Sequence, residues 1–114
     1  MTDDIKMTEG PDGSRFWYRN GLLHREDGPA VECADGSRQW YWEDAIDRRG
    51  FQFGLERSAD GATHYVAGCH KWPSLEVALA HFGIDYRGNG DREECRRLLH
   101  EVAARIAKQG EIKP

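Results

Sequence analysis

The chain has 114 residues, with 16 Lys and Arg against 20 Asp and Glu and a formal net charge of -4 at pH 7. That length supports a single domain with one core, and the acidic balance argues against direct binding to nucleic acid or to a membrane surface, for which proteins use an excess of basic residues. Hydrophobic residues make up 39% of the chain and aromatic residues 11%, which excludes the disordered class of protein.

No stretch of the sequence approaches the roughly 18 consecutive apolar residues of a membrane-spanning helix, and residues 1–9 are mostly polar. We therefore expect a soluble protein in the cytoplasm. The three cysteines, Cys33, Cys69 and Cys95, are odd in number and widely spaced. We expect reduced thiols, no paired-cysteine metal site and no cofactor.

An internal repeat marks the first half of the chain. Residues 12–18 (DGSRFWY) return as residues 35–41 (DGSRQWY), displaced by 23 positions, and a weaker third copy begins at Asp60. Each copy opens with Asp-Gly, which favours a tight turn, and continues with aromatic residues that favour a strand. In the first copy Asn20-Gly21 separates two such runs, which is a strong hairpin signature.

The alternation of residue types in the repeat predicts which side chains share a face of the sheet. Trp17 lies on one face with Arg15 and Arg19, whereas Phe16 and Tyr18 lie on the other, so both faces carry aromatic side chains. The sequence therefore predicts an antiparallel meander of five to seven short strands over residues 12–67.

Two helices are predicted after Gly68. Pro73 and Ser74 are typical of a helix start, and Gly83 of a helix end. Asp91, with Glu94 three residues later, begins a second helix that extends to about residue 108. Its apolar residues recur with the 3.6-residue period of a helix: Cys95, Leu98, Leu99, Val102 and Ile106.

The predicted fold is an α+β single domain over residues 1–114. It comprises the β repeat region (12–67), packed by two helices from a helical region (68–109). Residues 1–11 and 110–114 are expected to be flexible tails.

Residues 17–31 (WYRNGLLHREDGPAV) resemble the Trp-Tyr-x-Asn-Gly-x-x-His-Arg-x-Asp-Gly-Pro-Ala repeat of small bacterial and bacteriophage proteins, a variant similar to MORN repeats. The resemblance covers about residues 12–43; further on, Glu43-Asp44 replaces Asn-Gly. It implies a β-hairpin architecture used as an interaction scaffold. It also implies the context of small acidic phage products that block host proteins, including CRISPR effectors.

The leading hypothesis is a non-enzymatic protein-binding module, in its sharper form a phage or prophage inhibitor of a bacterial defence complex, similar to anti-CRISPR proteins. Residues 1–60 carry 13 acidic and 8 basic residues, a net charge of -5, so steric or acidic-patch blocking of a host protein is the expected mode. Tryptophan anchors and carboxylates are the candidate partner-binding residues: Trp17, Trp40, Trp42, Glu26, Asp27, Glu43, Asp44 and Asp47.

The run His24-Arg25-Glu26-Asp27 also resembles an acid–base group. A structural role is favoured, in which Asp27 caps the turn at Gly28, His24 packs at a strand end, and Arg25 and Glu26 are solvated.

Two alternatives come from other classes of protein. Cys69, His70 and His81, with His64, supply thiolate and imidazole groups of the kind that bind Zn²⁺, which predicts a small metal-binding or hydrolytic domain. Exposed sheet edges or aromatic residues would instead predict a structural module that assembles with copies of itself.

Overall fold

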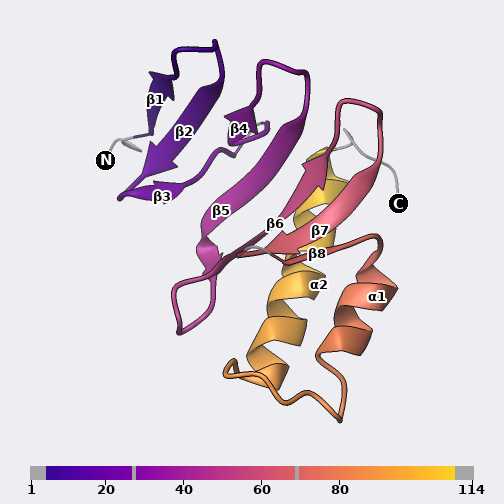
Figure 1. Cartoon of the computed structure of the whole chain (residues 1–114). Helices are drawn as coiled ribbons and strands as arrows, with labels where there is room; N and C mark the ends of the chain where they lie inside the picture. Colours follow the sequence, from indigo (N-terminus) through magenta and orange to yellow (C-terminus); the bar gives the residue numbers. More distant parts are fainter. Residues whose placement is uncertain (1–4, 27, 69, 110–114) are drawn as a thin grey trace.

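One antiparallel sheet carries two helices on one of its faces in the computed structural model, which describes residues 5–26, 28–68 and 70–109 (Figure 1). The predicted α+β class is confirmed. The strands are β1 (Lys6–Glu9), β2 (Arg15–Arg19), β3 (Leu22–Leu23), β4 (Val31–Glu32), β5 (Arg38–Ile46), β6 (Gln52–Arg57), β7 (Thr63–Ala67) and β8 (His70–Trp72), and the helices are α1 (Leu75–His81) and α2 (Arg92–Gln109).

The sheet follows the order β1-β2-β4-β5-β6-β7-β8, and β3 pairs with the end of β2 beside Tyr18 and Arg19. Six strands lie within residues 12–67, which confirms the predicted meander. Two strands were not expected. Residues 6–9 were assigned to a flexible tail, which is wrong because they pair with β2 from Lys6↔Tyr18 to Glu9↔Arg15. β8 lies in the expected helical region and pairs with β7.

The Asp-Gly repeat is a recurring hairpin turn. In residues 10–14, 33–37 and 58–62 the first N–H donates to the fifth carbonyl oxygen over 2.8–2.9 Å. In each turn the Asp carboxylate accepts the fifth N–H, at 2.9–3.0 Å, and the fourth residue is a Gly with φ between +92° and +95°, which only glycine adopts readily. The copy at Asp60 is therefore a third instance of the same turn.

The predicted Asn20-Gly21 hairpin joins β2 to β3. Asn20 has φ +55° and Gly21 φ +79°, so both central residues adopt the left-handed conformation of a type I′ turn. Beyond β3 the chain returns to the middle of β2, where the N–H of His24 donates to the carbonyl oxygen of Trp17 at 2.9 Å and the N–H of Trp17 to that of Ala30 at 2.8 Å.

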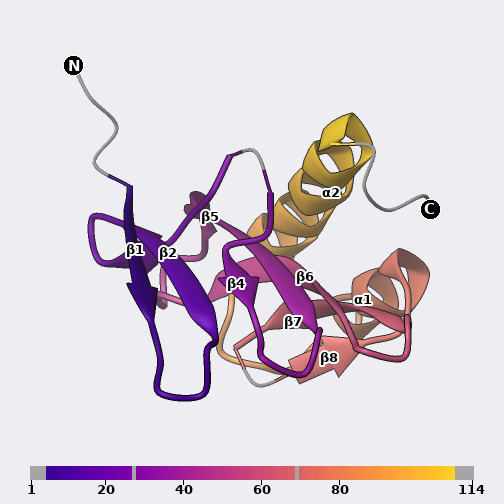
Figure 2. The same ribbon diagram turned by 90° about the horizontal axis from the view of Figure 1, so that it is seen from above.

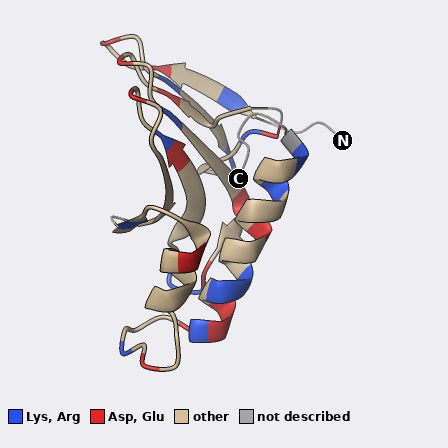
Figure 3. Cartoon of the chain, turned by 90° about the vertical axis from the view of Figure 1, so that its right-hand side faces the viewer, with Lys and Arg blue, Asp and Glu red and all other residues tan. Residues whose placement is uncertain are grey.

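Both helices begin at the predicted caps. The Ser74 hydroxyl accepts the N–H of Val77 at 3.1 Å, and the Asp91 carboxylate accepts those of Glu93 and Glu94, which satisfies backbone donors that lack a partner in the first turn. Basic and acidic residues alternate along α2 (Figure 3). Neither helix of the described residues is long and apolar enough to cross a membrane.

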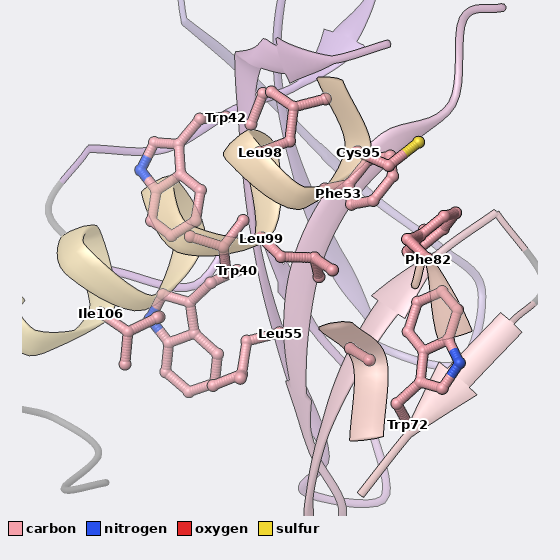
Figure 4. Close-up of a cluster of buried hydrophobic side chains, with 14 residues drawn as sticks. Trp40, Trp42, Phe53, Leu55, Trp72, Phe82, Cys95, Leu98, Leu99 and Ile106 are labelled. Carbon is pink, nitrogen blue, oxygen red and sulfur yellow. The ribbon is translucent and has the colours of Figure 1, made fainter. Parts of the chain in front are cut away.

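The core lies between the helices and β5 to β8 (Figure 4). Trp40, Phe53 and Leu55 are 0–1% exposed there. All five apolar positions predicted for α2 are buried against them: Cys95, Leu98, Leu99, Val102 and Ile106. Fully burying a large apolar side chain stabilises the fold by about 1.5–3 kcal/mol, so this face of α2 is a principal source of stability.

The helices leave the other half of the sheet uncovered, since β1 and β2 lie away from both of them (Figure 2). The aromatic residues of β2 are only half-buried there.

The side chain of Gln52, on β6, connects the two halves of the sheet. Its amide accepts the N–H of Leu23 at 3.1 Å and donates to the carbonyl oxygens of Leu23 and Trp42 at 2.8 and 3.2 Å. These bonds replace strand pairing between β3 and β5.

Candidate functional site

Three of the predicted partner-binding carboxylates, those of Glu26, Glu43 and Asp44, lie in one region of the surface. Arg19, at the end of β2, forms ion pairs with Glu43 on β5 and with Glu26 at 3.5 Å. Asn20, in the type I′ turn, donates to Glu43 at 3.0 Å. The turn thus holds the end of β2 beside β5, and the hydrogen bonds from Arg19 and then Asn20 lower the pKa of Glu43.

Asp44 is held by α2. Two nitrogens of Arg105 donate to its carboxylate at 2.6 and 2.9 Å, and this pairing lowers the pKa of Asp44. Arg105 also contacts Glu101 at 3.1 Å and lies over the ring of Trp42, 5.4 Å from its centroid. A bidentate guanidinium fixes a carboxylate more firmly than a single bond does, so Asp44 has a defined orientation.

We call these groups the acidic cluster: Glu26, Glu43, Asp44 and Glu101 with Arg19 and Arg105. These six side chains, four carboxylates and two guanidinium groups, together carry two negative charges. The side chains of Glu26, Asp44 and Glu101 are 59%, 66% and 40% exposed. The cluster therefore presents accessible negative charge in an ordered arrangement, which suits a basic partner surface.

His24 supports this cluster from beneath. It is 3% exposed, and its Nδ1 accepts the backbone N–H of Glu43 at 3.0 Å, so the proton lies on Nε2, which faces Glu26 at 3.3 Å. The backbone N–H of Glu43 needs a side-chain acceptor because the pairing of β5 with β6 shifts register between Tyr41 and Ile46. The predicted structural role of His24, packed at a strand end, is confirmed.

The prediction that Arg25 is solvated is wrong. Its guanidinium lies 4.0 Å from the centroid of the Trp17 ring and donates to the carbonyl oxygen of Pro29 and to Glu32 at 3.2 and 3.3 Å. It shields one of the predicted tryptophan anchors, which remains half-buried. Asp27, also predicted, lies outside the described residues.

Three of the residues predicted to bind a partner are buried, so the prediction is wrong for them. Trp40 and Trp42 are 0% and 4% exposed because α2 covers them. Asp47 is 4% exposed; its carboxylate accepts the backbone N–H groups of Arg49 and Phe51 at 2.9 and 3.1 Å and pairs with the Arg49 guanidinium at 2.7 Å. That carboxylate stabilises the turn between β5 and β6.

A groove of about 550 Å³ lies between both helices and the sheet. Its lining is mainly apolar: Leu55, Tyr65, Leu75, Ala103, Ile106 and Ala107. Burial raises the pKa of Tyr65 in this wall. The sequence analysis did not predict this groove. The feature that could have indicated it is the pair of small side chains at positions 103 and 107, one helical turn apart.

The structure brings together only part of the predicted metal-ligating set. His70 and His81 lie side by side, with ring centroids 5.7 Å apart. His64 precedes Tyr65 on β7 and so lies on the opposite face of the sheet, and Cys69 lies outside the described residues. Within residues 5–26, 28–68 and 70–109, no three His, Cys, Asp or Glu residues are grouped as metal ligands.

Comparison of the chain with protein-family models, with curated proteins and with solved structures finds no match.

Proposed function

We propose that the protein is a non-enzymatic protein-binding module that uses the acidic cluster to bind a basic surface of a partner protein. The observation that carries this proposal is the convergence of Glu26, Glu43 and Asp44, from a loop and a strand, on two arginines that fix them without neutralising them. Charges already held in place lose little conformational entropy on binding, and complementary charge accelerates and orients association.

The ionisation of these carboxylates supports binding over acid–base chemistry. Hydrogen bonds from Arg19 and Arg105 lower the pKa values of Glu43 and Asp44, whereas a general acid or base works best with a pKa near the operating pH. His24, the adjacent imidazole, is buried and accepts a backbone N–H. These groups are suited to presenting negative charge.

The resemblance of the repeat to small phage proteins gives the proposal a specific form. The partner would be a host protein of a bacterial defence complex, and the acidic cluster would occupy a basic groove that otherwise binds nucleic acid. In this form the protein acts in the bacterial cytoplasm by blocking access, and it binds no nucleic acid itself.

A double charge reversal tests the proposal. Purified wild-type chain, Glu26→Lys/Asp44→Lys and the control Asp85→Lys/Glu93→Lys are used as baits in a bacterial lysate, and captured proteins are quantified by mass spectrometry. Both variants change the net charge by the same amount, and the control positions are exposed residues outside the cluster. We expect a stoichiometric partner to bind the wild type and the control and to be lost from the cluster variant.

The salt dependence of the captured complex provides a second criterion. Binding that depends on exposed charges should weaken as ionic strength rises. A partner retained equally by the cluster variant, or one insensitive to salt, would contradict the proposal. Unchanged melting temperatures of both variants establish that folding is intact.

The free edge of β1 supports a second proposal, self-assembly by strand pairing between copies. All four β1 residues are exposed, and β1 ends the sheet, with no strand on its outer edge among the described residues. An unpaired edge offers backbone donors and acceptors to another chain. Light scattering over a concentration series tests this: a dimer supports it, and a monomer at all concentrations rejects it.

A further inference from the structure

Two histidines from different elements lie side by side at the β8 edge of the sheet. His70 begins β8 and His81 ends α1. Their ring centroids are 5.7 Å apart and their planes are inclined by 41°. Both residues are exposed to solvent. The acidic cluster uses neither of them.

Aromatic rings hold both imidazoles in place. Trp72, which is 7% exposed, has its ring centroid 5.9 Å from that of His70 and 5.3 Å from that of His81. The rings of Phe82 and Tyr86 lie 4.8 and 5.6 Å from the His81 ring. Figure 4 shows Trp72 and Phe82 next to each other in this part of the core. Such packing restricts ring rotation and so lowers the entropy lost when both rings bind one ligand.

The backbone beneath the two rings is also well anchored. β8 pairs with β7 through Ala67↔His70 and Tyr65↔Trp72, and the Ser74 cap fixes the start of α1. Lys71, the residue between His70 and Trp72, points to the opposite face, where its ammonium group pairs with Glu56 at 2.9 Å. That cation therefore does not repel a positive ion at the two imidazoles.

We propose that His70 and His81 form a chelating site for one divalent late transition-metal ion of the Ni²⁺, Cu²⁺ and Zn²⁺ class, with water in the remaining coordination positions. Imidazole is a preferred ligand for these ions. Metal–nitrogen distances of about 2.0–2.1 Å place the ring centroids of two histidines roughly 5 Å apart around a tetrahedral ion, and about 4.5 Å apart when they bind at right angles around a square-planar or octahedral ion. The observed centroid separation of 5.7 Å therefore needs a closure of about one ångström.

Titration calorimetry with Ni²⁺ on the full chain tests this site. We expect one ion per wild-type chain, and at least about tenfold weaker binding by His70→Ala and by His81→Ala, because each variant loses the effective concentration that the second imidazole provides. The double variant should lose less binding free energy than the sum of the two single losses, because either single substitution already removes the chelate effect, and this non-additivity is the signature of two ligands on one ion.

Two control variants assign the site. His100→Ala removes an exposed histidine on α2, and Cys69→Ala removes the thiol that precedes His70; both should bind Ni²⁺ as the wild type does. An affinity for Ni²⁺ within twofold of the wild type in His81→Ala, or a loss of binding in His100→Ala or Cys69→Ala, would overturn the proposal.

Another variant of His81 tests whether a loss of binding results from misfolding. His81→Phe keeps an aromatic ring against Phe82 and Tyr86 but removes both nitrogens. Bound Ni²⁺ should raise the melting temperature of the wild type, because the ion joins β8 to α1 in the folded state only. It should leave that of folded His81→Phe unchanged, and an equal rise in both proteins would reject the site.

Discussion

Trp17 and Trp40 occupy equivalent positions of the internal repeat, 23 residues apart, yet they differ in their surroundings. Trp40 lies in the half of the sheet covered by α2 and is 0% exposed. Trp17 lies in the uncovered half, where Arg25 covers its ring and leaves it half-buried. Two copies of one local pattern thus serve different purposes, because the helices lie over only one of them.

The turn carboxylates also differ in their burial. In the covered half the buried Asp47 is fully hydrogen-bonded within one turn. The carboxylates of the three repeat turns, Asp12, Asp35 and Asp60, are exposed instead. The acidic cluster lies where the halves meet, which explains why it combines a fixed geometry with solvent access.

Tryptophan truncation should show the largest difference between the halves. We expect Trp40→Ala to lower the free energy of unfolding by about 3–5 kcal/mol, because it opens a cavity among fully buried side chains. Trp17→Ala should cost about 1–2 kcal/mol, since it loses partial burial and the contact with Arg25. Urea denaturation measures both values, and equal losses would refute the distinction between the halves.

Glycine substitutions should show the next largest difference in stability between the two halves. A Cβ on Gly54 in β6 would lie 2.2 Å from the Trp40 carbonyl oxygen and 2.7 Å from the Tyr41 ring, so Gly54→Ala must displace β5 at a cost of about 3 kcal/mol. Gly10→Ala, before the first hairpin tip, meets nothing closer than 3.4 Å. It should change the stability by less than about 0.5 kcal/mol. Thermal and urea unfolding of both variants provide the measurement.

Removing a turn carboxylate should have an intermediate effect that depends on burial. We expect Asp47→Ala to cost about 2–3 kcal/mol, because two backbone N–H groups and a guanidinium lose a buried acceptor. Asp35→Ala removes a solvent-exposed acceptor, whose donors water can satisfy, so its effect should be clearly smaller. A larger loss of unfolding free energy for Asp35→Ala would contradict this assignment.

Acidification should produce the smallest and most gradual effect. The pKa of Asp44, at the junction of the halves, lies below its ordinary value of 3.8 because Arg105 donates to it, and that of Asp12 lies below 3.8 because of hydrogen bonds from Ser14. A carboxyl group with a lowered pKa stabilises the fold above its ordinary pKa and loses this contribution as the pH falls through that value and below.

We therefore expect the free energy of unfolding to decline as the pH falls below about 4. Asp44→Asn and Asp12→Asn should each flatten part of this decline, which urea titrations at pH 7, 4 and 3 would show. Stability that is constant over this range, or a decline that neither variant alters, would contradict the cited pKa directions.

Local patterns were sufficient to predict most of the fold. The Asp-Gly turns, the Asn20-Gly21 hairpin and the Ser74 and Asp91 caps depend on backbone conformation within a few residues, so their residue types identify them. The edge strand β1 has exposed, mostly polar residues without alternation, and its pairing depends on β2. No pattern within residues 6–9 could have revealed it.

The candidate site was predictable only in part. The excess of acidic residues in the first half of the chain led to Glu26, Glu43 and Asp44, but the same reasoning selected Asp47, which is buried. Whether a carboxylate is paired, buried or presented depends on residues distant in the sequence, such as Arg105, which is 61 positions from Asp44. Composition contains no information about that pairing.

The sequence by itself determined the strand-and-turn repeat, both helix starts and the buried face of α2, because these follow from turn geometry, capping and a 3.6-residue period. Only the tertiary structure decided which of two equivalent tryptophans is buried, which carboxylates Arg19 and Arg105 hold at the surface, and that His70 meets His81. Burial and charge pairing arise from contacts between distant segments, and such contacts exist only once the helices have packed on one half of the sheet.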